Sequence, residues 1–385
     1  MKALIFTLLC VTFLSVIQRA YSANFLIYNA VGTHSTRISM TPYMEALANK
    51  GHNITFLSAF ENNDPVKHPQ KECSKMWYEL KNLGLAACTM LYSRSAYFVT
   101  DEIFQAFTRW TAITKTGLEL DEFASFSEIE KNASLILLTT HFSMDYPRSF
   151  PPNVIPIGGT VVSKKTKPLP KDMEKFINEG KEGFIFISFG SVAEFVNFDE
   201  EVQREFILAL KSFPKLRFIW KSTFDINATL PSNVLVTKWA PQQTLLAHPK
   251  IKAFVTHSGM GSTTEAIHFA VPLICVPILA EQDMNAEVIA LRGAGIKLEI
   301  IGLRQHEMEH ALTEILHNEK YRNGMKKLSE IFKDRQIPPL ETAVWWTEYI
   351  LRHEDTNSFL RSPSVEQTWW AKRNVDVWVV LHLAY

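Results

Sequence analysis

The stretch KAFVTHSGMGSTTEAIHFA, residues 252–270, runs from an apolar segment through two glycines into a helical pattern. Its first six residues predict a buried strand, and its last ten predict the helix that follows. Gly259 and Gly261 supply the first half of a G-x-G-x-x-G dinucleotide fingerprint, but Thr264 occupies the position of the third glycine. The stretch therefore predicts an α/β strand–turn–helix unit that is not the dinucleotide fingerprint.

The turn between this strand and helix has the features of a phosphate site. In an open α/β sheet, ligands bind beyond the carboxyl ends of the strands. We expect the backbone amides of residues 259–263 to be free donors at the helix N-terminus, where phosphates bind readily. His257 could add a hydrogen bond or a positive charge, and Glu265 is placed to accept from a ribose diol. The alternative is a tight turn whose polar residues only cap the helix.

Further polar and aromatic residues follow the neighbouring predicted strands. Trp239 ends one of these strands, where its indole could stack on a nucleobase, and Gln242 could bond a base edge. The alternative for Trp239 is packing at the strand end. Glu281 and Gln282 follow the next strand on the same edge, where they could bond the vicinal hydroxyls of a sugar. Base, ribose, phosphate and sugar would then be bound along one rim.

The C-terminal half alternates regularly between strand and helix patterns, which predicts a doubly wound parallel sheet. The predicted strands are 184–190, 216–222, 233–239, 252–257 and 272–278. The predicted helices are 199–213, 242–249, 261–270 and 283–295, followed by a long helical segment over 304–335 and a helix over 340–353.

The N-terminal half begins with a βαβ unit, and a polar linker over 162–172 follows it later in the chain. In the unit, strand patterns at 24–30 and 53–60 flank a helix pattern that stops at Gly51. Residues 61–133 have helical stretches but little strand signal. The strand pattern returns at 134–141 and at 154–160.

The composition and the N-terminal sequence limit the class of protein to which the chain can belong. The 385 residues suffice for about two domains, and 40 basic against 40 acidic residues leave no basic excess for nucleic acid. Lys2 precedes an apolar run with a small-residue exit, which predicts a cleaved secretory signal over residues 1–22. An uncleaved anchor is the alternative. The apolar run at 375–385 is too short to span a bilayer as a helix.

Sequons and cysteines add little to this assignment. Asn53, Asn132 and Asn227 begin Asn-x-Ser/Thr sequons, which can be glycosylated in a secreted chain. The four cysteines have no metal-ligand spacing, and three of them remain after signal cleavage. Cys275 lies in a buried-strand pattern and is expected in the core. We expect neither a metal site nor a disulfide scaffold.

Residues 239–295, from WAPQQ to LRGAG, resemble the nucleotide-sugar signature of the UDP-glycosyltransferases, the membrane-bound animal enzymes related to UDP-glucuronosyltransferases. The spacing from His257 to Gln282 fits the signature over its whole length. PLETAVWWTEYILRH at 339–353 resembles the C-terminal segment of the family, and IPIGGT at 155–160 resembles its stretch before the interdomain linker. The resemblance covers nearly all of the chain except about residues 61–130.

The resemblance implies a GT-B fold, an α/β architecture in which two Rossmann-like domains face a cleft. The segments expected from it are a signal peptide (1–22), an N-terminal acceptor domain (23–162), a C-terminal UDP-sugar domain (163–338) and a C-terminal helix with a membrane-segment stub (339–385). The N-terminal domain is expected to be incomplete, because residues 61–133 are too few for its remaining strands.

The resemblance also implies the donor site. Trp239 would stack on uracil and Gln242 would bond it, while Glu265 would hold the ribose. His257 and the backbone that includes Gly259, Gly261 and Ser262 would hold the diphosphate, and Glu281 with Gln282 would hold the sugar. Two positions depart from the family: Ser258 replaces a common glycine, which restricts the backbone, and Glu281 replaces the commoner aspartate. UDP-sugar is a co-substrate, and no cofactor is implied.

The proton acceptor implied by the resemblance is His34, which follows the first predicted strand. Sugar transfer with inversion has an acceptor hydroxyl attack the anomeric carbon as UDP departs, and a neutral histidine can take that proton. In the family an aspartate from a later strand supports the histidine. Neither Asp101 nor Asp121 lies in a convincing parallel strand, so we do not identify this partner.

The leading hypothesis is a UDP-glycosyltransferase that transfers glucose or glucuronate to a hydroxyl of a small lipophilic acceptor, in the endoplasmic reticulum lumen or associated with its membrane. The rival is an inactive UDP-sugar-binding isoform that pairs with full-length relatives, so homo- or hetero-oligomers are considered. A third hypothesis is another GT-B enzyme, such as a nucleotide-sugar epimerase.

Overall fold

The computed structural model describes residues 24–29, 34–58, 133–163, 168–190, 195, 198–223, 225–226, 228–278, 281–353, 355–372 and 374–384. Several sequence predictions lie outside these residues. They are the signal peptide at 1–22, the sequons at Asn132 and Asn227, three cysteines (Cys10, Cys73 and Cys88), the segment 61–132, and the two candidate carboxylates Asp101 and Asp121.

A six-stranded parallel sheet forms the centre of the C-terminal half, as the alternating pattern predicted. Its order is β10-β9-β8-β5-β6-β7, so the chain reverses direction of winding beside β5 and β8. The strands are β5 (Phe184–Ser188), β6 (Arg217–Lys221), β7 (Val234–Thr237), β8 (Ile251–Thr256), β9 (Leu273–Cys275) and β10 (Gly295–Lys297).

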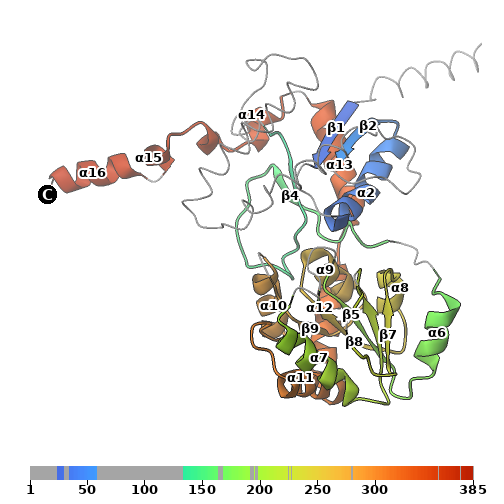
Figure 1. Ribbon diagram of the computed structural model, residues 1–385. Coiled ribbons are helices and arrows are strands. Elements are labelled where there is room, and N and C mark those ends of the chain that lie inside the picture. The colour runs from blue at the N-terminus through green and yellow to red at the C-terminus, as the bar shows by residue number, and fades with distance from the viewer. Residues whose placement is uncertain are drawn as a thin grey trace, which may run out of the picture.

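Helices cover both faces of this sheet (Figure 1). They are α6 (Lys171–Asn178), α7 (Glu200–Lys211), α8 (Gln242–Leu246), α9 (Met260–His268), α10 (Gln282–Leu291), α11 (Gln305–His317) and α12 (Glu319–Lys333). Successive side chains of β5 point to opposite faces. Ile185 and Ile187 join a core with α7 and α11, whereas Phe184 and Phe186 join a core with α6, α8, α9, α10 and α12. Cys275 is completely buried, as predicted.

Three elements differ from the sequence prediction. Helix α6 begins at Lys171, inside the predicted linker, because Met173 and Ile177 bury one face of it. The short strand β10 begins at Gly295, where the predicted helix ends, and no strand is predicted there. The helical segment at 304–335 is broken at Asn318, whose side chain accepts a hydrogen bond from the Lys320 amide and caps α12.

The described N-terminal residues form a βαβ unit and a separate strand pair. Strands β1 (Asn24–Asn29) and β2 (Asn53–Ser58) are parallel and are joined through α2 (His34–Asn49). Strands β3 (Ile136–Leu138) and β4 (Val154–Pro156) also pair in parallel. The βαβ unit agrees with the prediction, and α2 ends two residues before Gly51.

Helix α13 (Pro339–Arg352) leaves the C-terminal half and packs against α2 (Figure 1). Thr347 Oγ1 donates to the Ala343 carbonyl, so the Tyr43 hydroxyl donates to Thr347 Oγ1 at 2.8 Å. We call the region where α2 and α13 are in contact the α2–α13 seam. It joins segments about 300 residues apart, which no local sequence pattern predicts.

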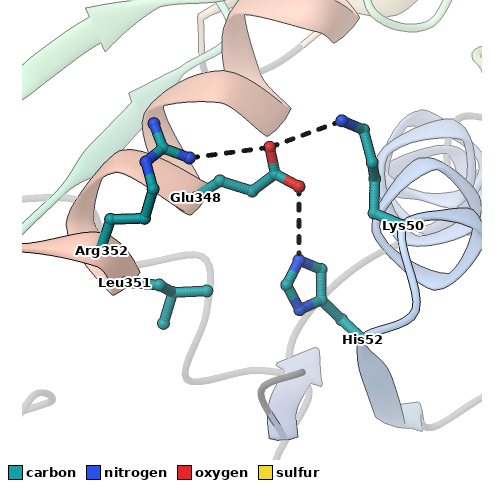
Figure 2. Close-up of a pocket in the computed structure, with 5 residues that line it drawn as sticks. All are labelled: Lys50, His52, Glu348, Leu351 and Arg352. Carbon is teal, nitrogen blue, oxygen red and sulfur yellow. Dashed lines mark ion pairs between the residues drawn. The ribbon is translucent and has the colours of Figure 1, made fainter. Parts of the chain in front are cut away.

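A carboxylate lies at one end of the seam (Figure 2). Glu348 faces Lys50 at 3.6 Å, His52 at 3.7 Å and Arg352 at 4.0 Å, and all three distances exceed hydrogen-bond length. These residues and Leu351 line a cavity of about 240 Å³. Among the described residues, the polar contacts of the seam therefore include one short hydrogen bond and several loose ion pairs.

The chain continues after α13 through α14 (Asn357–Leu360), a 3₁₀ turn (Pro363–Val365), α15 (Trp369–Lys372) and α16 (Val375–Ala384). Helices α15 and α16 extend away from the rest of the molecule in Figure 1. Within the described part of the chain, no helix combines the length and the apolar character needed to cross a membrane.

Candidate functional site

The candidate donor site lies at the carboxyl edge of the six-stranded sheet, the edge where β5 to β9 end. Because parallel strands end on the same side, the residues that follow them meet there. Trp239 follows β7, His257 follows β8, and Glu281 precedes α10 after β9. Candidates that the sequence separates by more than forty residues therefore lie on one edge of the sheet, although β7 and β9 are not neighbouring strands.

The turn between β8 and α9 has the predicted strand–turn–helix form. Gly259 is the N-cap of α9, and the Thr263 amide donates to the Gly259 carbonyl at 3.0 Å. The prediction that amides 259–263 are all free is therefore wrong at Thr263, since that amide closes the first helical turn. The amides that remain for a ligand lie before it, at Gly259, Met260, Gly261 and Ser262.

Ser258 adopts a left-handed backbone conformation with φ of 63°, which is uncommon for a residue with a side chain. Its side chain is fully buried, and its carbonyl accepts a hydrogen bond from Asn285 Nδ2 at 2.9 Å. The Asn285 contact from α10 holds the turn in this conformation. Serine at position 258, where the family commonly has glycine, thus adopts the backbone conformation that favours glycine.

The His257 ring is enclosed by two glycines. A Cβ atom on Gly190 would lie 2.7 Å from His257 Cε1, and one on Gly259 would lie 2.6 Å from Nε2. Any larger residue at either position would displace the ring. Gly259 is therefore required by a close approach of the imidazole, in addition to its place before α9.

His257 is a neutral group in this environment. Burial lowers its pKa most, the charge of Lys221 lowers it as well, and a hydrogen bond with the Ser188 backbone opposes both, so that the pKa is about 4. Of the two roles considered from the sequence, a hydrogen bond and a positive charge, the geometry supports the hydrogen bond.

Lys221 is the positive charge nearest His257 whose effect on that ring is resolved, and sequence reasoning missed it. It is the last residue of β6, and its Nζ donates to the Gly190 carbonyl at 2.7 Å. That contact places an ammonium group beside the His257 ring, where a diphosphate would lie. The available signal was a lysine at a strand terminus on the carboxyl edge.

Glu265 is the centre of a buried hydrogen-bond network. Its carboxylate accepts from Gln242 Nε2 at 2.6 Å and from Gln243 Nε2 at 2.7 Å, and only 7% of the residue is exposed. Burial raises the pKa of Glu265, and these two hydrogen bonds oppose the rise. Each carboxylate oxygen has a second acceptor site, so Glu265 could still accept two ribose hydroxyls.

Gln242 and Gln243 have different second partners. Gln242 Nε2 also contacts Ser262 Oγ at 3.2 Å, so the glutamine predicted to bond the base is joined to the first turn of α9. Gln243, which sequence reasoning did not select, also bonds the backbone of Val161 and Ser163. The double glutamine was visible in the sequence, but its partners were not.

The remaining donor-site candidates differ in exposure. Trp239 is 58% exposed, so packing at the strand end does not cover its ring. Glu281 is exposed at the N-cap of α10. Gln282 is buried, and its Oε1 accepts from the Ile278 amide at 3.0 Å. Trp239 and Glu281 thus present accessible side chains, whereas the Gln282 side chain is partly committed to the local backbone.

His34 is the first residue of α2, after β1, which agrees with its predicted place at a strand-to-helix turn. Its candidate carboxylate partners, Asp101 and Asp121, lie outside the described residues. Among the described residues, no group of three or more His, Cys, Asp or Glu could hold a metal ion.

Comparison with known proteins identifies the family. The family profile described as "UDP-glucoronosyl and UDP-glucosyl transferase" matches residues 90–384. UDP-glucosyltransferase 2 of Dactylopius coccus is 35% identical over 257 residues, which is 67% of this chain and 49% of the relative. UDP-glucuronosyltransferase 1A7 of Rattus norvegicus is 33% identical over 304 residues, which is 79% of this chain and 53% of the relative. The chain therefore spans about half the length of these relatives.

A crystal structure of Medicago truncatula UGT71G1 complexed with UDP-glucose has the same fold, with a TM-score of 0.58 and 17% identity over 88% of this chain and all of that one. The GT-B fold class predicted from the sequence is confirmed. On the match of the profile to most of its length, the chain belongs to the UDP-glucuronosyl and UDP-glucosyl transferase family.

Proposed function

We propose that this chain binds a UDP-sugar at the carboxyl edge and transfers its hexosyl group, glucose or glucuronate, to a hydroxyl of a small lipophilic acceptor with inversion. Family membership and the names of its relatives support a hexosyl donor activated as UDP. The proposal covers the activity of this chain, which spans about half of those relatives.

The donor would lie along the carboxyl edge from Trp239 to Glu281. Trp239 would stack on uracil, and Gln242 would bond the base or the adjoining ribose. Glu265 would accept from the ribose hydroxyls, since both of its oxygens keep an acceptor site. The pair Glu281 and Gln282 would hold the sugar hydroxyls, with the exposed Glu281 as the more accessible of the two.

The diphosphate would lie against the β8–α9 turn. Amides at the N-terminus of α9, including those of Gly259, Gly261 and Ser262, would donate to its oxygens. A neutral His257 would donate one further hydrogen bond, and Lys221 would supply the positive charge. These separate roles of His257 and Lys221 are supported by the low pKa of His257, about 4, and by the contact of Lys221 Nζ with the Gly190 carbonyl.

One observation carries the proposal: an exposed indole, a buried carboxylate with spare acceptor sites, and a helix N-terminus beside a lysine all occur at one sheet edge. An aromatic face, an acceptor of hydroxyls and donors to phosphate are the three kinds of group that a nucleoside diphosphate needs.

For the transfer step we propose His34 as the proton acceptor. The acceptor hydroxyl would lose its proton to the imidazole as its oxygen bonds the anomeric carbon and UDP leaves with the electrons of the broken bond. His34 at the start of α2 supports this role, because the residue follows a strand of the N-terminal half.

Two further features are proposed from the resemblance and the N-terminal apolar run: entry into the secretory pathway towards the endoplasmic reticulum lumen or its membrane, and association with copies of itself or with related glycosyltransferases.

The test is release of UDP from UDP-glucose and from UDP-glucuronate by the full chain, with and without a panel of phenols. The proposal expects UDP release that depends on a phenol, together with the glycosylated phenol as product. UDP binding without any product would contradict the transferase assignment and favour a UDP-sugar-binding isoform. Absence of UDP binding by folded protein would contradict the donor site itself.

A further inference from the structure

Gln243 joins the segment between β4 and α6, which we call the interdomain linker, to the carboxylate at the candidate ribose site. Its Nε2 donates to Glu265 Oε1 at 2.7 Å and to the Val161 carbonyl at 3.0 Å. Its Oε1 accepts from the Ser163 amide at 2.9 Å. One side chain thus uses both amide hydrogens and its oxygen to connect three points, two of which are about 80 residues away in sequence.

The orientation of this amide is fixed by its partners. If the oxygen and nitrogen were exchanged, the oxygen would face the Glu265 carboxylate and the Val161 carbonyl, and the NH₂ group would face the Ser163 N–H. All three contacts would then be repulsive. The hydrogen-bond network therefore has one arrangement, and it requires an amide at position 243.

The linker position and the Glu265 position depend on each other through this contact. Val161 and Ser163 lie between β4 and α6, where the chain passes from the N-terminal to the C-terminal half. Movement of this segment would remove two of the three partners of Gln243 and would leave its side chain held by Glu265 alone. Nothing in this network would then fix the direction from which Gln243 bonds Glu265, and Gln242 would be the better oriented donor to that carboxylate.

We propose that Gln243 is a positioning residue that couples the interdomain linker to nucleotide binding. The inference rests on the proposed function, because it takes Glu265 as the acceptor of ribose hydroxyls. A docked linker holds Gln243, Gln243 orients the Glu265 carboxylate, and the oriented carboxylate binds UDP more tightly. By linkage, bound UDP stabilises the docked linker by the same factor.

Two variants of the full chain test the coupling. Gln243→Leu removes every polar contact at similar size, and it should weaken UDP binding about tenfold, the loss of one hydrogen bond to a charged group. Gln243→Glu keeps the shape and the acceptor for Ser163 but places a second carboxylate against Glu265. Thermal unfolding of each variant verifies that it folds.

The pH dependence of UDP affinity separates positioning from a general structural role. At pH 8 both variants should bind UDP about tenfold more weakly than the wild-type chain. At pH 5.5 the two carboxylates of Gln243→Glu can share a proton, because like charges in contact raise one pKa. The protonated carboxyl then donates to Glu265, so affinity should recover in Gln243→Glu but not in Gln243→Leu. His257 and the UDP phosphates titrate in both variants. Their effect on UDP affinity is therefore the same in both and does not change the difference between them.

Hydrogen exchange at the Ser163 amide measures the same coupling from the linker side. UDP should slow this exchange in the wild-type chain by about the factor that Gln243→Leu loses in affinity, and it should have no effect on exchange in that variant. Wild-type affinity in both variants, or protection of Ser163 by UDP in Gln243→Leu, would overturn the coupling alone. Failure of the folded wild-type chain to bind UDP would overturn the proposed function and the coupling with it.

Discussion

Glu265 and Glu348 each join segments that are far apart in the sequence, but their surroundings differ. Glu265 is buried and accepts two hydrogen bonds of 2.6 and 2.7 Å from the neighbouring helix α8. Glu348, in the α2–α13 seam, is partly exposed and faces Lys50, His52 and Arg352 at 3.6 to 4.0 Å. Short buried hydrogen bonds fix the position of an atom, whereas long ion pairs near solvent contribute little to either position or stability.

This difference suggests that the carboxyl edge of the sheet and the α2–α13 seam have different roles. The carboxyl edge holds Glu265 with short buried hydrogen bonds, and the seam connects α2 and α13 with weaker contacts. Changes at the edge should therefore alter nucleotide binding, changes at the seam should alter stability slightly, and a change at His34 should alter only transfer. The predictions below begin with the largest expected effect.

His34→Ala should lower the rate of hexosyl transfer by about 10²- to 10⁴-fold, since it removes the proton acceptor. UDP affinity should be unchanged, because every proposed nucleotide contact lies in the C-terminal half. Initial rates with a panel of phenols measure the first effect, and calorimetry with UDP measures the second. The exposed His317 on α11 provides the control, and His317→Ala should leave both quantities unchanged. Turnover that persists in His34→Ala would place the base elsewhere.

His257 should make the fold less stable in acid. Its folded pKa of about 4 lies below the usual 6.5, so the unfolded chain binds the proton more tightly between these values. The free energy of unfolding should therefore fall as the pH is lowered from 6.5 to 4, by about 3 kcal/mol for this group. His257→Gln should flatten that dependence, as measured by chemical unfolding at several pH values. An equal slope in both proteins would show that His257 is not buried as a neutral ring.

Trp239→Ala should weaken UDP binding by about 1–3 kcal/mol, the usual loss when a base–aromatic stack is removed. Trp345, an exposed tryptophan of α13 in the seam region, offers a matched control. Trp345→Ala removes a similar ring and should leave UDP affinity unchanged. If the two variants lost affinity equally, the exposed indole at the sheet edge would have no particular role in binding.

Glu348→Gln should have the smallest effect, a loss of less than about 1 kcal/mol in the free energy of unfolding, because ion pairs near solvent are weak. Differential scanning calorimetry at low and high salt measures this change, and the difference from wild type should shrink as salt rises. A loss of several kcal/mol would mean that the loose pairs of the seam hold the two halves together after all.

The sequence predicted most of the C-terminal sheet, because each strand and helix there has a clear local period. The strand–turn–helix at 252–270 is an example: its apolar run, glycines and helical pattern all agree with the structure. Helix α6 was missed because its proline- and lysine-rich start resembles a linker, and only burial of Met173 and Ile177 reveals it. Strand β10 has three residues, too few for a pattern to appear.

The candidate site was predicted in its residue types but only partly in its interactions. Trp239, His257 and Glu265 could be chosen from their places after strands. The neutral state of His257 depends on burial and on Lys221, which is 36 positions away in the sequence, and neither is visible in a local pattern. Gln243 was missed for the same reason, since its partners Val161 and Ser163 lie about 80 residues upstream.

Calorimetric titration of UDP into the full chain, the Glu265→Ala variant and the Glu299→Ala variant tests the central claim most directly. Glu299 is an exposed glutamate of the same domain and serves as the control. The account predicts saturable binding by the wild-type chain and by Glu299→Ala, and affinity lowered about 10- to 150-fold in Glu265→Ala, the loss of hydrogen bonds to a charged group. Equal affinity of all three folded proteins for UDP, or no binding by any of them, would contradict a nucleotide site at the carboxyl edge.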